Sequence, residues 1–178
     1  MKGQANHFIL GLGSNLGDRA DVLGQAIACL RQLPGTRVLA ISEAVDSDPV
    51  GYAGQPNFLN LCLAIVCDFS PDELLSRTAA IELQLGRTRS ANRNGPRTLD
   101  IDLLFYEGGA WESPTVTLPH PRWSSRGFVI IPLRNLLQDP ALAKVAAWAS
   151  LAGEVRSLPV GGQGLRAWQG PTPWSKTP

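Results

Sequence analysis

The chain has 178 residues and a formal net charge of +1, with 44% hydrophobic and 17% charged residues. This length allows one domain with a substantial core, and the sequence has no apolar stretch long enough for a transmembrane helix or a signal-peptide core. The near-neutral charge argues against a general nucleic-acid or membrane surface, and the three cysteines suit neither a disulfide framework nor a zinc site. The sequence therefore predicts a soluble, cytoplasmic protein.

The first part of the chain predicts two strands around one helix. Residues 8–12 form a short apolar strand that runs into the glycine-rich loop GLGSNLG at 11–17. Asp18 is placed to cap the next helix, whose apolar positions recur at helical spacing up to Pro34. Residues 37–46 predict a second strand. The glycine loop matches neither dinucleotide-binding nor P-loop spacing, so it is either a ligand-lining loop or a tight turn.

A second unit of strand, helix and strand follows a loop at 47–56, which contains two prolines and two glycines. Residues 58–67 are apolar enough for a central strand. Ser70 and Glu73 have the spacing of a capping box, which marks the start of a helix. The largely apolar run at 99–106 predicts the final strand of this unit.

The resulting order, β-α-β-β-α-β, predicts a ferredoxin-like plait. This is an α+β fold with a mostly antiparallel sheet and helices on one face. The sequence then predicts a short hairpin near Gly108 and extra C-terminal helices near 127–137 and 140–152. We expect residues 1–160 to form a single domain and residues 161–178, which lack periodicity, to form a poorly ordered tail.

Two aspartates one residue apart interrupt the apolar strand at 99–106. Because side chains alternate along a strand, Asp100 and Asp102 project from the same face, roughly 7 Å apart at their backbones. Two like charges side by side are unfavourable unless a cation neutralises them, and carboxylate oxygens suit Mg²⁺. The pattern predicts a magnesium site that also holds phosphates. A solvated edge strand would show the same alternation.

Arginine dominates the positive charge, since only three of the 16 cations are lysines. The arginines that precede the aspartate strand are Arg77, Arg87, Arg89, Arg93 and Arg97. Guanidinium groups match phosphate oxygens, which favours a polyphosphate held by metal and arginine together, with a solvated basic loop as the alternative. His120, between two prolines, is either a phosphate donor or a turn cap. Sequence alone places Phe58 and Phe128 in the core.

Several short motifs occur together in chain order. They are GSN at 13–15, DPVG at 48–51, QP at 55–56 with FLN at 58–60, IELQLGR at 81–87, GPRTLDID at 95–102, and LPH at 118–120 with RGF at 126–128. Over residues 8–137 this set resembles the 6-hydroxymethyl-7,8-dihydropterin pyrophosphokinase family of folate biosynthesis. The resemblance implies a ferredoxin-like enzyme with two Mg²⁺ ions and ATP as co-substrate. Such enzymes transfer pyrophosphate from ATP to the hydroxymethyl oxygen of the pterin and release AMP.

The resemblance also implies a role for each matching position. Asp100 and Asp102 would hold the metal ions and, with Arg87 and Arg97, form the catalytic set. The implied ATP-binding residues are Glu82, Arg87, Arg97, Thr117, His120 and Arg126. The implied pterin-binding residues are Asp48, Val50, Phe58, Asn60 and Phe128. The two phenylalanines would then be stacking walls instead of core residues.

Three positions depart from the pattern of the family. Asn94 stands where well-known members have a tryptophan, Thr115 where they have an arginine, and Pro121 where they have an aromatic residue. These differences bear on adenine contacts and on the way the loops at 47–56 and 87–98 close over the site.

Two other functions remain open on the sequence. A nucleotidyltransferase also combines an early Gly-Ser pair with a later Asp-x-Asp strand, but it would release pyrophosphate instead of AMP. A non-catalytic ferredoxin-like module for RNA or a small regulator would need exposed aromatic residues and no metal, and paired aspartates would repel a phosphate backbone. We expect a monomer whose partners are ATP and the pterin, without nucleic acid or membrane.

Overall fold

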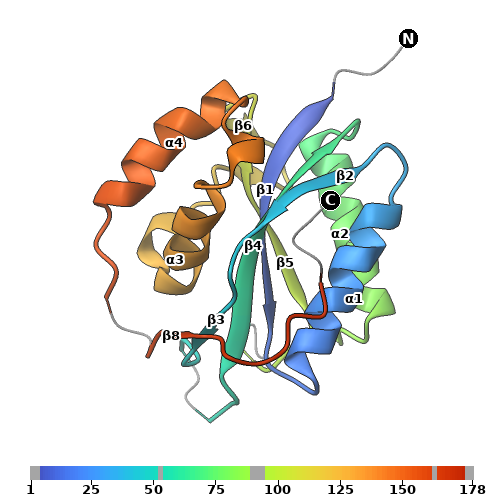
Figure 1. Cartoon of the computed structure of the whole chain (residues 1–178). Helices are drawn as coiled ribbons and strands as arrows, with labels where there is room; N and C mark the ends of the chain where they lie inside the picture. Colours follow the sequence, from blue (N-terminus) through green and yellow to red (C-terminus); the bar gives the residue numbers. More distant parts are fainter. Residues whose placement is uncertain (1–4, 52–53, 89–94, 162–163, 175–178) are drawn as a thin grey trace.

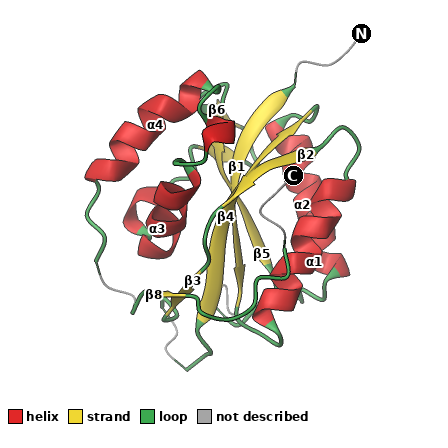
Figure 2. Ribbon diagram, in the orientation of Figure 1, coloured by secondary structure: helices red, strands yellow, loops and turns green. Residues whose placement is uncertain are grey.

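The computed structural model describes residues 5–51, 54–88, 95–161 and 164–174. Its elements form three layers, in which a central sheet has helices on both faces (Figure 1, Figure 2). In chain order they are β1 (Asn6–Ser14), α1 (Arg19–Gln32), β2 (Arg37–Ile41), β3 (Val45–Ser47), β4 (Phe58–Cys67), α2 (Pro71–Gln84), β5 (Asp100–Tyr106), β6 (Trp111–Glu112), β7 (Thr117–Leu118), η1 (Trp123–Ser125), α3 (Gly127–Leu136), η2 (Pro140–Leu142), α4 (Ala146–Ser157) and β8 (Arg166–Ala167). None of the helices in these ranges is long and apolar enough to cross a membrane.

All strand pairs of the main sheet are antiparallel. β1 and β4 occupy its centre, and β5 pairs with the other side of β1. β2 and β3 pair with successive parts of β4, and β8 extends the sheet beyond β3. If β2 and β3 are taken as one interrupted strand, this is the ferredoxin-like order, so the predicted fold class is confirmed. The helices are not confined to one face, because the C-terminal helices α3 and α4 cover the second face (Figure 1).

Local sequence signals explain where the first two helices begin. The Asp18 carboxylate accepts a hydrogen bond from the backbone N–H of Asp21 at 3.0 Å, as expected of an N-cap. Ser70 and Glu73 form the predicted capping box at the start of α2. The bounds of β4 coincide with the predicted central strand at 58–67.

The predicted strand at 37–46 is divided into β2 and β3. Between them, the backbone N–H of Ser42 donates to the Cys62 carbonyl, and the Ser42 hydroxyl accepts from the Cys62 N–H, each at 2.9 Å. The Ser42 hydroxyl replaces the backbone carbonyl that would normally accept this hydrogen bond. The chain therefore stays next to β4, although the regular hydrogen-bond ladder between the strands is interrupted. The predicted helix at 140–152 is likewise divided, into η2 and α4. The hairpin expected near Gly108 is a turn followed by a separate β6–β7 hairpin.

Apolar clusters lie on both faces of the sheet. The cluster beneath α1 and α2 contains Phe8, Leu10 and Leu12 of β1, whereas Ile9 belongs to the cluster beneath α3 and α4. Because side chains alternate, Gly11 and Gly13 lie on the same face as Ile9. They contribute no side chains, so this end of the face beside α3 is left open.

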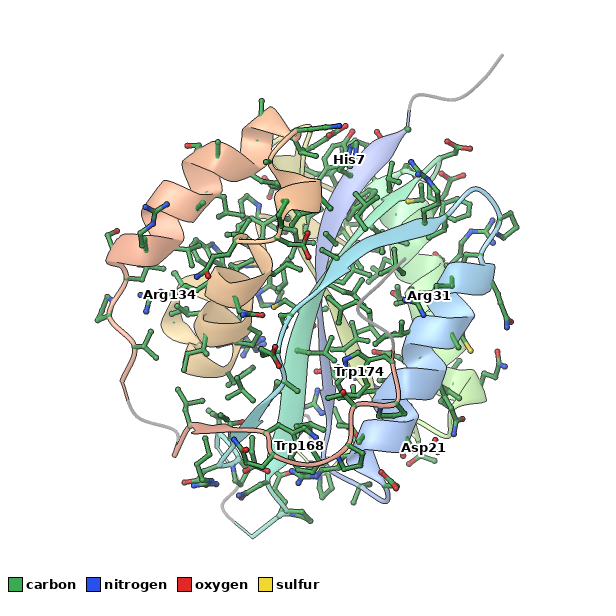
Figure 3. All side chains as sticks on the ribbon, in the orientation of Figure 1. His7, Asp21, Arg31, Arg134, Trp168 and Trp174 are labelled. Atoms are coloured by element: carbon green, nitrogen blue, oxygen red, sulfur yellow. The ribbon has the colours of Figure 1, made fainter. Side chains whose placement is uncertain are left out.

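The C-terminal segment docks on the rest of the chain. The backbone N–H of Trp168 donates to the Ala44 carbonyl at 3.2 Å, next to the pairing of β8 with β3. Trp174 is only 4% exposed and belongs to the cluster beneath α1 and α2; Figure 3 labels both tryptophans. Within the tail expected to be poorly ordered at 161–178, residues 164–174 are described, and they include these docked positions. Burying an indole ring removes a large apolar area from water, which offsets the entropy of ordering the segment.

Candidate active site

A cavity of about 510 Å³ lies between one end of β1, β4 and β5 and the first turn of α3. Most of the predicted site residues meet there. Those that line the cavity are Asp48, Val50, Phe58, Asn60, Arg87, Arg97, Asp100, Asp102, His120, Arg126 and Phe128. Glu82 and Thr117 are outside this lining. Segments far apart in the sequence thus form one pocket.

The paired aspartates reach the cavity from β5, an edge strand of the main sheet. In the ladder, Asp100 lies opposite Gly13 and Asp102 lies opposite Gly11. Because glycine has no side chain, β1 leaves the space beside both carboxylates open. The side chains of the aspartates are only 25% and 35% exposed, which differs from a fully solvated edge strand.

Arginines form ion pairs with both carboxylates. Asp100 accepts from Nη1 of Arg87 at 2.7 Å through Oδ1 and from Nη1 of Arg97 at 2.8 Å through Oδ2. Arg126 donates through Nη1 to Oδ2 of Asp102 at 3.1 Å. Guanidinium groups also bind phosphate oxygens well, so the cavity offers both acidic groups for a cation and basic groups for a polyphosphate.

Two of these arginines also contact the aromatic residues of the cavity. The guanidinium carbon of Arg97 lies 5.9 Å from the ring centroid of Phe58, and that of Arg126 lies 5.6 Å from the ring centroid of Phe128. Both rings are half-buried and line the cavity, so the assignment of these phenylalanines to the core alone is wrong. The charged part of the cavity therefore borders directly on an aromatic part.

A buried amide lies between these aromatic residues and the glycine face. Asn60 is 6% exposed, and its Nδ2 donates to Oγ of Ser47 at 3.0 Å. A Cβ atom added to Gly13 would lie only 3.0 Å from Oδ1 of Asn60. The glycine therefore leaves room for the amide oxygen, and Ser47 fixes its orientation.

Glu82 acts from behind the cavity instead of lining it. Its Oε1 accepts from the backbone N–H of Ile101 at 2.7 Å and forms an ion pair with Arg87. Burial raises the pKa of Glu82 to about 7, although the hydrogen bond from Ile101 and the charge of Arg87 oppose the change. Glu82 thus connects α2 to β5 and holds the arginine that binds Asp100.

Thr117 is exposed on the β6–β7 hairpin, outside the cavity lining. This hairpin is fixed to α2 by Asp72, which accepts from Nε1 of Trp111 at 2.9 Å and from Oγ of Ser113 at 2.6 Å. Thr115, where the family pattern has an arginine, donates its hydroxyl to the same carboxylate at 2.5 Å. The hairpin therefore has a defined position although its strands are short.

His120 lies in the cavity lining beside the charged cluster. Its Nδ1 accepts a hydrogen bond from the backbone N–H of Arg122 at 3.1 Å. This ring nitrogen therefore caps the turn, which was one of the two roles expected for His120. Burial lowers the pKa of His120, although the nearby Asp102 opposes the change. In a neutral ring whose Nδ1 accepts a hydrogen bond, the proton is on Nε2, which can donate to a ligand.

The donor set fits a magnesium ion that retains other ligands. Burial raises the pKa of Asp102, the charge of Asp100 raises it further, and His120 and Arg126 only partly offset this. A cation between such carboxylates would relieve both effects. Within the described part of the chain, no group of three or more His, Cys, Asp or Glu residues could hold a metal ion. Mg²⁺ commonly takes one or two carboxylates, with water and substrate phosphates as its other ligands.

The cavity also includes residues that sequence reasoning missed. They are Ser47, Leu61, Cys62, Leu104, Arg122, Ser125 and Val129. Gly11, Leu12 and Gly13 also line the cavity; they belong to the 11–17 segment, for which a ligand-lining loop was one of two interpretations, but they lie in β1. Arg122 and Ser125 could have been found from their position between His120 and Arg126 in the sequence. The contribution of Gly11 and Gly13 depends on strand register, which the motifs do not give. The positions of Arg89, Arg93 and Asn94 are outside the described residues.

Paired carboxylates and arginines in one pocket form an arrangement that suits an enzyme of the phosphate-transferring class. Comparison with known sequences identifies the family. The model of the family 7,8-dihydro-6-hydroxymethylpterin-pyrophosphokinase (HPPK) matches residues 9–138. The chain belongs to this family, as the motifs predicted.

Related proteins carry the corresponding name. The chain is 38% identical over 164 residues to a 2-amino-4-hydroxy-6-hydroxymethyldihydropteridine pyrophosphokinase of Bacillus subtilis, with 92% of this chain and 91% of that protein covered. It is 40% identical over 128 residues to the protein of the same name from Pseudomonas aeruginosa, with 72% and 78% covered.

Solved structures agree in fold. The crystal structure of Plasmodium falciparum HPPK-DHPS with pterin and p-hydroxybenzoate matches with a TM-score of 0.58 at 13% identity. The match covers 86% of this chain but only 42% of the Plasmodium chain, so the present protein spans less than half of that one. At this identity the likeness supports the fold alone.

Proposed function

We propose that this protein transfers the terminal pyrophosphate of ATP to the hydroxymethyl oxygen of 6-hydroxymethyl-7,8-dihydropterin. The products would be AMP and the pterin diphosphate, as a step of folate biosynthesis. The observation that supports this most strongly is that Asp100, Asp102 and their arginine partners share one cavity with Phe58, Phe128 and Asn60. Family membership supports the same reaction.

The aromatic part of the cavity suits a flat, polar heterocycle. We assign the faces of the pterin ring to Phe58 and Phe128, because aromatic side chains favour offset stacking. Asn60, held by Ser47, would read the polar edge of the ring through its amide. The backbone near Asp48 and Val50 would complete the pocket.

The basic part of the cavity suits the triphosphate. Arg87, Arg97 and Arg126 would bind phosphate oxygens and offset the charge that develops on the departing AMP. His120 would donate a further hydrogen bond. Glu82 would contribute indirectly, through its ion pair with Arg87. We assign Thr117, which lies outside the cavity lining, to a contact with the outer part of the nucleotide.

Asp100 and Asp102 would hold two Mg²⁺ ions. Magnesium bound there would neutralise the triphosphate and help to align it with the hydroxymethyl group. The side chains of the protein perform the remaining tasks, since transfer of this type depends mainly on positioning and charge neutralisation. Among the described residues, no side chain of the cavity stands out as an obligatory general base, and the proton of the hydroxymethyl group would pass to Asp102 or to water.

The proposed enzyme is a monomer that acts in the cytoplasm. A single chain supplies the cavity described above, including its aromatic and charged parts. The proposed substrates are small molecules, so the reaction involves neither nucleic acid nor a membrane.

The nucleotide product tests this function. The protein is incubated with ATP and Mg²⁺, with and without hydroxymethyldihydropterin, and the nucleotides are separated by chromatography. We expect AMP to form only when the pterin is present, and no product after chelation of the metal. Pyrophosphate release would instead identify a nucleotidyltransferase, and ADP would identify transfer of a single phosphoryl group. No turnover with either substrate would favour the non-catalytic module.

A further inference from the structure

The C-terminal segment reaches the wall of the cavity through one arginine. β8 pairs with β3 so that Arg166 lies opposite Asp46. Nη2 of Arg166 donates to Oδ1 of Asp48 at 2.7 Å and to Oδ1 of Asp46 at 3.1 Å. Asp48 lines the cavity, whereas Arg166 lies outside the lining. The arginine therefore joins β8 to the cavity wall from behind.

Asp46, one of the two carboxylates that Arg166 contacts, is itself held by other hydrogen bonds. Its side chain is 15% exposed, and it accepts from Nη1 of Arg19 at 2.8 Å and from Nδ2 of Asn57 at 3.1 Å. Burial alone would raise the pKa of Asp46, but hydrogen bonds from Arg19, Arg166 and Asn57 hold it below its ordinary value. The Asp48 side chain is 50% exposed and lies at the rim. Arg166 thus connects a well-held carboxylate to a more exposed one.

A second contact between the tail and Asp48 comes from Gly164. This residue has a φ of +49°, and a Cβ atom added to it would lie 2.0 Å from Oδ2 of Asp48. The Asp48 carboxylate therefore occupies the space that a side chain at position 164 would need. Both the missing side chain and the left-handed backbone favour glycine here.

We propose that Arg166 is a positioning residue for the pterin end of the cavity, acting through Asp48. The proposal rests on the proposed function, in which the backbone near Asp48 contacts the pterin. By bridging Asp46 and Asp48, Arg166 holds the segment that follows β3 in its binding conformation. The family match covers residues 9–138, so Asp46 and Asp48 lie within the matched region, whereas Arg166 and Gly164 lie beyond it.

Kinetics of an Arg166→Met variant test this role. Methionine keeps much of the apolar side chain but cannot bridge two carboxylates. We expect KM for the pterin to rise about three- to fivefold, the range for losing one exposed ion-pair network, with kcat and KM for ATP nearly unchanged. Arg166→Lys should recover part of the loss. Arg156→Met on α4 replaces another exposed arginine, away from the cavity, and should leave all three constants unchanged.

A double-mutant cycle separates positioning from general stability. If Arg166 acts through Asp48, adding Arg166→Met to an Asp48→Asn variant should change KM for the pterin much less than it does in the wild type. An unchanged pterin KM in Arg166→Met, or fully additive effects, would overturn the proposal. Direct pterin binding is measured in parallel. If the wild type forms no AMP, the proposed function fails, and pterin affinities still decide the role of Arg166.

Discussion

Asp100 of β5 lies directly opposite Gly13 of β1, and Gly13 in turn lies opposite Asn60 of β4. One glycine therefore separates the group we assign to the metal from the group we assign to the pterin. Since Gly13 has no side chain, the two proposed substrates can approach each other across β1. This relationship explains why an extended glycine is found in a central strand, where glycine is usually unfavourable.

Gly13→Ala should weaken pterin binding. The added methyl group would lie 3.0 Å from Oδ1 of Asn60, so the amide must shift by a few tenths of an ångström from the position in which Ser47 holds it. We expect KM for the pterin to rise roughly tenfold, equivalent to about 1.4 kcal/mol, with a smaller change for ATP. Gly153→Ala on α4, which has open space around it, is the matched control and should leave KM unchanged. Equal KM values in both variants would refute the role of Gly13.

Phe128→Ala should reduce pterin affinity more than nucleotide affinity. The variant removes a ring that lines the cavity, and stacking contributes on the order of 1 kcal/mol beyond the buried area. We expect an increase of about tenfold or more in the pterin dissociation constant, measured by titration calorimetry. Phe128→Leu, which keeps apolar volume without a ring, should give an intermediate value. If Phe128→Leu binds as tightly as the wild type, stacking is not the interaction that Phe128 provides.

Glu82 should make the unliganded protein less stable as the pH rises from about 4.5 to about 7. Burial raises its pKa from 4.5 to about 7, so in this interval the folded state binds more protons than the unfolded state. Its contribution to the free energy of unfolding is therefore greatest below pH 4.5 and falls as the carboxyl ionises. After allowance for solvent screening, we expect a change on the order of 1 to 2 kcal/mol.

Urea unfolding of the wild type and Glu82→Gln at several pH values measures this effect. The glutamine cannot ionise, but its amide oxygen can still accept from Ile101. The difference in stability between the two proteins should shift in favour of the variant as the pH increases across the interval. A difference that stays constant with pH would show that Glu82 ionises normally in the folded state.

Elements with strong local signals were predictable from the sequence. The capping box at Ser70 and the continuous apolar run of β4 each depend on residues close together in the chain. The interruption after β2 was not predictable, because Ser42 replaces a ladder acceptor only through its contact with Cys62 in another strand. The docking of Trp174 is also a long-range packing effect, which local composition does not reveal.

The candidate site shows the same division. The alternation of Asp100 and Asp102 predicted that they share a face, and both do line the cavity. Their partners depend on the fold, since Arg126, the residue before α3, contacts Asp102, and strand register places Gly13 opposite Asp100. The link from Arg166 to Asp48 spans more than a hundred residues and had no sequence signal at all.

We assign the centre of pyrophosphate transfer to Asp100 and Asp102. The most direct measurement compares turnover and ATP affinity in Asp100→Ala and Asp102→Ala with those of the wild type. We expect AMP formation to fall by about 10³-fold or more, equivalent to roughly 4 kcal/mol of lost transition-state stabilisation, while ATP affinity changes far less. Near-normal turnover in either variant would contradict this role for the two aspartates.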